Sequence, residues 1–243
     1  MSNWVYWLVV TEVVAWVVMI LGILSQKLNW LAFPSGFLLF ALALLLLLII
    51  AIIAVLLLIL AFPTHHPHWW PPSVIATVVG LAPIAIIILS LGPDKLSAPR
   101  IHDISTDLNN PPTYKAVLTA RSASANSLAF SEEVASQQRQ AYPDIQPLLL
   151  KQSSQQVFDR ALSLVQRRNW TVLRQDKTAG EIEAVEETTL FGFKDDVIIR
   201  IAEVEDGSRV DMRSASRVGQ SDLGANRERI NKFLQELREG GEI

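Results

Sequence analysis

Seven side chains between residues 195 and 226 have the types and spacing to recognise an anionic ligand or a partner. Aspartates and arginines alternate there, and arginine guanidinium groups bind carboxylates and phosphates through paired hydrogen bonds. The loop at residues 218–221 then leads into a predicted helix, whose first N–H groups attract anions. Asp222, in the first turn of that helix, is an internal candidate for the same role. The candidate ligand- or partner-binding residues are Asp195, Asp196, Arg200, Arg213, Arg217, Asp222 and Asn226.

Catalysis by this cluster would depend on carboxylates. The chain has no cysteine, and His102 is the only histidine after residue 68. No nucleophile elbow, phosphate-binding glycine loop or zinc signature occurs, so the sequence predicts no catalytic residue, no metal and no cofactor. The alternative is an enzyme or an anionic-ligand binder that uses Asp195, Asp196, Arg213 and Arg217.

Glu12 is a second candidate, because it is the one ionisable residue inside an apolar stretch. A carboxylate without a partner at that depth costs about 2.5 kcal/mol or more, so we predict that Glu12 is structural and mostly protonated. By depth it should lie level with residues 77–83, where Pro83 leaves the carbonyl of Val79 free and Gly80 permits close approach. The alternative is a proton or cation relay in a small transporter.

The distribution of charge shows why Glu12 is unusual. Only Glu12 and Lys27 are charged before residue 94. Three apolar stretches separated by prolines are each long enough to cross a hydrocarbon core of about 30 Å as a helix. They comprise residues 4–24, 37–62 and 74–91. We therefore predict a three-helix transmembrane region at residues 1–92.

The connection between the second and third stretches contains His65, His66 and His68. Three histidines can ligate a metal ion, but the prolines among them and the lack of a nearby acid favour an interfacial loop. Orientation depends on few charges. Lys27, Lys95 and Arg100 lie on the side of the polar domain, so a strict count of positive residues places that domain in the cytoplasm.

The polar part of the chain does not have the charge of a nucleic-acid-binding protein. The whole chain has a net charge of −3, and Glu12 and Lys27 cancel, so the part after residue 93 also carries −3. No basic stripe is present that could replace phosphate counterions. We therefore exclude nucleic acid as a partner.

The polar part is predicted to be a linker rich in Pro, Asn and Asp at residues 93–113, followed by a soluble domain at residues 114–243. A short strand at 114–120 and a helical turn at 132–140 are expected first. A helix capped by Ser153-Ser154 follows, then four strands and a last helix. The strands are expected at 170–175, 181–191, 197–205 and 208–217, and the last helix at 222–238. This order predicts an α+β fold, an antiparallel meander sheet with helices packed on one face.

The last hairpin should decide which side chains face each other. If residues 206–207 form a two-residue turn, Arg200 lies opposite Arg213, and Asp196 lies opposite Arg217. Alternation sends one set of residues toward the helices and a charged set to the outer face. The inward set is Val197, Ile199, Ile201, Val210 and Met212, and the outward set is Arg200, Asp211, Arg213 and Arg217.

Two arginines directly opposite each other repel, so a negative group is expected between them. We expect an acid of the second strand, Glu183 or Glu187, to supply it, and a bound anion is the alternative.

Several separated motifs resemble domain-of-unknown-function family 1499. They are residues 191–196 (FGFKDD) with Arg200, residues 213–226 (RSASRVGQSDLGAN), residues 101–107 (IHDISTD) with the Asn-Pro-Pro at 110–112, and residues 142–145 (YPDI). The resemblance covers roughly residues 100–238. It implies a bacterial or plastid protein without an established activity, so no catalytic assignment carries over. It also implies a periplasmic domain, although membrane-anchored members tend to have basic residues between the second and third spans, where this chain has histidines.

The sequence therefore predicts a multi-pass protein of the bacterial inner membrane with a periplasmic soluble domain. The function that it predicts is that of a non-enzymatic binding or assembly module at the cell envelope. The expected partners are the lipid bilayer and either a protein or a small anion. The enzyme and the small transporter are the alternatives.

Overall fold

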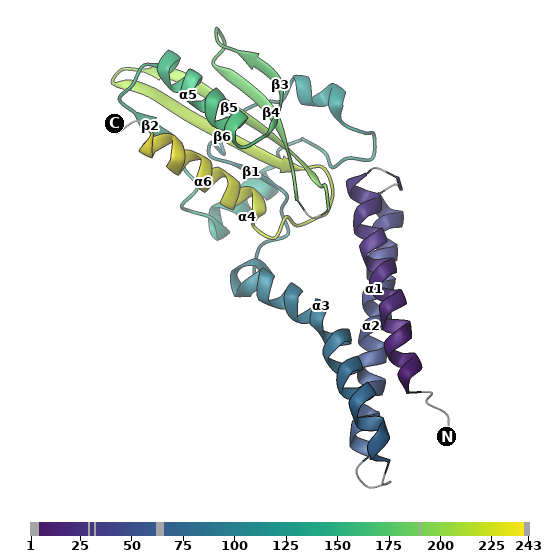
Figure 1. The fold of residues 1–243 in the computed structure, drawn as a ribbon. Helices are drawn as coiled ribbons and strands as arrows, with labels where there is room; N and C mark the ends of the chain where they lie inside the picture. The colour runs from purple at the N-terminus through teal and green to yellow at the C-terminus, as the bar shows by residue number, and fades with distance from the viewer. Residues whose placement is uncertain (1–4, 29, 32, 62–65, 190, 241–243) are drawn as a thin grey trace. The chain divides into compact units, whose positions relative to one another are not determined.

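The computed structural model describes residues 5–240 except residues 29, 32, 62–65 and 190, and it divides into two compact units. The first unit contains α1 (Tyr6–Lys27), α2 (Phe33–Ala61), the short 3-10 helix η1 (Pro67–Trp69) and most of α3 (Trp70–Leu96) (Figure 1). The three α-helices are long and apolar enough to cross a membrane. The prediction of three long apolar helices at the N-terminus is therefore confirmed.

Prolines mark the beginnings of α2 and α3 rather than the ends of their connections. Pro34 lies in the first turn of α2, and Pro71 and Pro72 lie in the first turn of α3. The third apolar stretch, which begins at residue 74 by composition, therefore starts its helix four residues earlier. The first turn tolerates proline because the N–H groups there have no partner within the helix.

The second unit contains a six-stranded antiparallel sheet. Along the sheet the order is β1 (Asp103–Ser105), β6 (Gly207–Ser216), β5 (Lys194–Val204), β4 (Glu181–Glu187) and β3 (Thr171–Asp176), and β2 (Leu148–Leu150) also pairs with β6. The helices are η2 (Ala116–Ala120), α4 (Glu132–Ala141), α5 (Ser154–Arg167) and α6 (Ala225–Glu239). The predicted α+β fold with an antiparallel meander is confirmed.

Two details of the predicted order are wrong. Residues 103–105, expected in an extended linker, form β1 and pair with β6. Residues 114–120, expected to include a short strand, contain the 3-10 helix η2. Both β1 and β2 are three residues long, too short for alternation to reveal them, and each is held by a partner far away in the sequence.

The hydrophobic core lies between one face of the sheet and the helices α5 and α6, which run side by side across it (Figure 1). All five residues predicted to point inward from β5 and β6 are buried there. Ser153 caps α5 as expected, since its side chain accepts a hydrogen bond from the N–H of Gln156. From α6, Ile230, Phe233, Leu234 and Leu237 join the core.

The register of the last hairpin differs from the prediction by two residues. Val204 pairs with Gly207, so the turn consists of residues 205–206, and Arg200 faces Asp211 rather than Arg213. Gly207 is needed within the strand: its φ is +135°, and a Cβ there would lie 2.1 Å from the carbonyl oxygen of Leu150. A shift of two residues preserves the face of every side chain, which is why the inward set was predicted correctly.

The opposite face of the sheet is covered as well. Tyr114 and Val117 pack on Ile198 and Ala215 to form a second, smaller cluster of buried residues. The segment between β1 and α4 therefore lies over the charged face that the sequence left open.

Candidate functional site

Arg213 of β6 is buried, and its donors are used within the chain. Its Nε and Nη2 donate to the two oxygens of Asp103, at 2.9 and 2.7 Å. Nη1 donates to the carbonyl of Pro112 at 3.1 Å, and Nη2 also donates to the carbonyl of Leu128 at 2.7 Å. The guanidinium lies 5.0 Å from the ring centroid of Tyr114. Burial acts to lower the pKa of Arg213, but the hydrogen bonds and charge of Asp103 raise it above its usual value.

Asp196 of β5 is shared between two arginines. Its carboxylate is 0% exposed and accepts hydrogen bonds from Nε and Nη2 of Arg217, at 3.0 and 2.7 Å, and from Nη1 of Arg121. Arg217 also donates to the carbonyl of Ala120 at 2.8 Å. Asp196 and Arg217 are therefore in contact, as expected, although the residue directly opposite Asp196 is Ala215.

Arg200 is neutralised by aspartates rather than by a glutamate of β4. Its Nη2 donates to Asp211 at 3.0 Å and to Asp107 at 3.2 Å. Arg209 binds the same two carboxylates, at 3.1 and 2.9 Å. The predicted opposition of Arg200 and Arg213 is wrong, because the register places Arg200 opposite Asp211 and Arg213 opposite Ile198.

The two glutamates expected between those arginines lie elsewhere. Glu183 is 0% exposed and accepts from the backbone N–H groups of Lys115 and Val117, at 2.9 and 3.0 Å. Its role is to hold η2 against the sheet. Glu187 is the last residue of β4, where it lies opposite Lys194.

Asp195 belongs to a different group, which joins the sheet to α6. Nη2 of Arg229 donates to Asp195 at 2.5 Å, and Arg229 also contacts Glu186. Burial raises the pKa of Asp195 to about 7 and lowers the pKa of Arg229 to about 10. In both cases desolvation disfavours the charged form, and for Asp195 a hydrogen bond with Ser216 acts in the opposite direction.

The beginning of α6 is occupied by the chain's own carboxylate. Asp222 accepts from the N–H groups of Gly224 and Asn226, at 2.8 and 2.9 Å. The side chain of Asn226 is 0% exposed, accepts from the hydroxyl of Ser214 at 2.7 Å, and donates to the carbonyl of His102 at 3.0 Å. A free anion would have to displace Asp222 to reach these amides.

The structure thus divides the seven candidates into four internally bonded groups, and sequence reasoning missed a principal partner of each. Those partners are Asp103, Asp107, Arg121 and Arg229. The available signal was the charge balance, since the outward arginines of β6 needed acids that the neighbouring strands did not supply at the right positions. Charge balance alone does not reveal which distant segment provides them.

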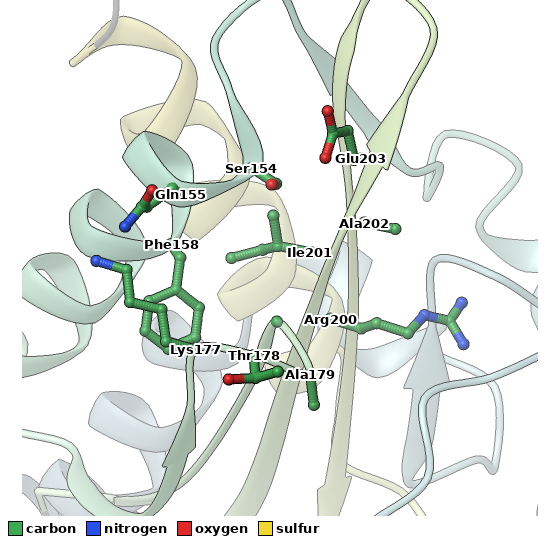
Figure 2. A pocket seen from close by; sticks show the side chains of 11 residues that line it. Ser154, Gln155, Phe158, Lys177, Thr178, Ala179, Arg200, Ile201, Ala202 and Glu203 are labelled. Carbon is green, nitrogen blue, oxygen red and sulfur yellow. The ribbon is translucent and has the colours of Figure 1, made fainter.

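An open pocket of about 690 Å³ lies elsewhere in this unit, between the beginning of α5 and the turn that joins β3 to β4 (Figure 2). Its lining includes the polar side chains of Ser154, Gln155, Lys177, Thr178 and Glu203. The side chain of Arg200 extends away from it in Figure 2, toward its aspartate partners. Lys177 binds Asp159 at 2.7 Å. Among the residues that the structure describes, no group of three histidines or carboxylates is placed to hold a metal ion.

The three histidines of the second connection are only partly within the described residues, because His65 lies outside them. His66 and His68 have ring centroids 5.5 Å apart, and His66 stacks on Trp69 at 4.5 Å. This is aromatic packing around η1.

Glu12 lies in the first unit, where α1, α2 and α3 meet. It is 0% exposed, and a Cβ on Gly80 would lie 2.7 Å from its Oε1. The indole N–H of Trp16 donates to the carbonyl of Val79 at 3.3 Å. The sequence predicted that Glu12 lies level with residues 77–83, and in the structure it contacts α3 within that range, at Gly80.

These features define a class of protein: an apolar three-helix anchor joined to an antiparallel α+β domain whose buried charges pair with one another. The chain belongs to the family described as protein of unknown function (DUF1499), whose model matches residues 103–237. That range begins with β1 and ends within α6, so it contains all six strands. No curated protein matches the chain.

Proposed function

We propose that this protein is a membrane-anchored binding or assembly module of the bacterial cell envelope, without a catalytic reaction of its own. The observation that supports this most is the internal pairing of the candidate cluster. Asp196 is held by Arg121 and Arg217, and Arg213 is held by Asp103. A general base needs a lone pair within reach of substrate, and these carboxylates direct theirs to buried arginines. The paired charges then stabilise the fold of the domain, and a partner would bind to the exposed surface of the domain.

A protein partner fits that surface better than a small anion. The two most exposed large apolar side chains among the described residues of the polar unit are Leu149, 68% exposed, and Leu118, 59% exposed. Exposed apolar side chains contribute to binding when a partner covers them. At the beginning of α6, by contrast, the amides that would bind an anion already bind Asp222.

Photocrosslinking in intact cells tests this proposal. A photoreactive residue placed singly at Leu118 and at Leu149 should give a discrete protein adduct from one of these positions. The matched control is Gln155, an exposed position at the pocket of Figure 2, which should give none. If neither leucine position gives a discrete adduct, and phosphate raises the melting temperature of the wild type but not of Lys177→Ala, the anionic-ligand alternative replaces the module.

We further propose that the polar unit faces the periplasm, because the family resemblance supports that side more strongly than three positive residues support the other. The chain has no cysteine, so single cysteines report on topology without background. Suitable positions are the exposed Ser122 and the exposed His68. Ser122→Cys should react with an impermeant thiol reagent in intact spheroplasts, and His68→Cys should react only after permeabilisation. The reverse pattern would place the polar unit in the cytoplasm.

A further inference from the structure

The carboxyl group of Glu12 is enclosed by three helices and has no hydrogen-bond partner. Neither of its oxygens is bonded within the described part of the chain. The glycine of α3 that faces it has no room for a methyl group: a Cβ on Gly80 would also lie 2.8 Å from the carbonyl oxygen of Leu47 and 2.9 Å from Cβ of Ala51. The three helices are therefore in close contact around a carboxyl group that nothing neutralises.

The contact at Gly80 brings no second charge to Glu12: besides Glu12, a Cβ on Gly80 would meet only the carbonyl of Leu47 and the methyl of Ala51 among its three nearest atoms. Asp94 and Lys95, at the end of α3, follow Gly80 by fourteen and fifteen residues, about 21 Å or more along the helix. Lys27 ends α1 fifteen residues after Glu12, about 22 Å along the helix. His68 precedes Gly80 by twelve residues, about 18 Å of helix, so neither residue can balance a negative charge at Glu12.

We propose that Glu12 is a proton-binding site inside the helix bundle, and that the bound proton is what allows α3 to pack on α1 and α2 at Gly80. A neutral carboxyl group fits an apolar contact between helices and can bond to a neighbouring carbonyl. An unpaired carboxylate requires water or a cation, and Glu12 is 0% exposed with neither oxygen bonded among the described residues. Loss of the proton therefore favours separation of α3. This inference concerns the first unit alone and is independent of the proposed function of the polar unit.

The occupancy of the site can be measured with a hydrophobic carbodiimide on the full chain in detergent micelles. The O–H of a protonated carboxyl group adds across one C=N bond, and the acyl group then moves from oxygen to nitrogen to give a stable N-acylurea without a leaving group. Peptide mapping should find this adduct on Glu12 at pH 6, with less of it as the pH rises. Glu12→Gln is the matched control and should carry no adduct on that peptide. A peptide that stays unmodified at pH 6 in wild type overturns the proton site.

The coupling to α3 needs a second measurement. Ser73 lies in α3 two turns before Gly80, is 0% exposed and has an unbonded hydroxyl, so Ser73→Cys is a conservative buried reporter. Its reaction with a maleimide is followed from pH 6 to pH 9 in two backgrounds, Glu12 and Glu12→Gln. We divide the rate measured with Glu12 by the rate measured with Glu12→Gln at each pH. This ratio removes the intrinsic pH dependence of the thiol, which is the same in both backgrounds.

We expect this ratio to rise by about fivefold or more over that range, the size of a typical coupling between two sites. Gly80→Ala, whose methyl group occupies the contact, should make the reporter reactive at every pH in both backgrounds. A ratio that stays constant while the carbodiimide adduct disappears would show that proton loss does not move α3, and would overturn the coupling.

Discussion

Replacing Arg213 with alanine should lower the free energy of unfolding of the polar unit by about 3–5 kcal/mol, the usual cost of removing one partner of a buried ion pair. Arg213 and Asp103 are each 3% exposed, so the substitution leaves a buried carboxylate without its cation. Urea unfolding of the full chain in detergent micelles, followed by hydrogen exchange of the amides of β6, measures the loss. The same pair joins β1 to β6, so the amides of β1 should lose protection as well.

Arg139→Ala is the matched control for this substitution. Arg139 and Glu132 form an exposed pair at 3.6 Å, with side chains 55% and 82% exposed, so the expected change is within about 0.5 kcal/mol. If Arg213 instead served to bind a ligand, Arg213→Ala would unfold nearly as the wild type does. Sulfate or phosphate would then stabilise the wild type and not the variant, and that result would contradict the structural role.

Asp196→Ala should be about as damaging, because it leaves two guanidinium groups facing each other. The side chains of Arg121 and Arg217 are only 6% and 13% exposed, and their mutual repulsion adds to the lost bonds. We expect a loss of about 3–5 kcal/mol in the free energy of unfolding. Local loosening should expose the bond after Arg121, so trypsin should cut there faster than in wild type.

Asp159→Ala controls for the removal of an aspartate. Asp159 binds Lys177 at the surface, with side chains 59% and 45% exposed, so it should change stability by no more than about 1 kcal/mol. Cleavage after Arg121 should stay at the wild-type rate. Equal cleavage rates in wild type, Asp196→Ala and Asp159→Ala would mean that Asp196 does not hold the segment around η2.

The sequence could predict which faces are buried because alternation is a local property. Val197, Ile199 and Ile201 point inward in any register that differs by an even number of residues. The turn was harder to predict, since Asp206-Gly207 is a strong signal for a two-residue hairpin. In the structure Gly207 allows the carbonyl oxygen of Leu150 to approach the strand closely. A local sequence pattern cannot predict such a contact, because Leu150 lies more than fifty residues away in the sequence.

The candidate site was predictable to a similar extent. Asp196 and Arg217 were expected together and are in contact, and Asp222 was expected as an internal occupant of the beginning of α6 and is one. The partner of Arg213 was not found, because Asp103 lies 110 residues away in a strand of only three residues. Conversely, Glu183 was expected between Arg200 and Arg213, whereas it binds the backbone amides of Lys115 and Val117 at the beginning of η2 and lies 3.5 Å from Arg174.

The pairing of β1 with β6 also has a consequence for the order of events during synthesis. Asp103 leaves the ribosome 110 residues before Arg213 does. At about 5–20 residues per second, β1 is without its partner strand for on the order of ten seconds. During that time its buried polar and apolar residues are unprotected, while α1 and α2 have already been made. Closure of the sheet is thus a late event in the synthesis of this chain, because β1 pairs only with a strand made about a hundred residues later.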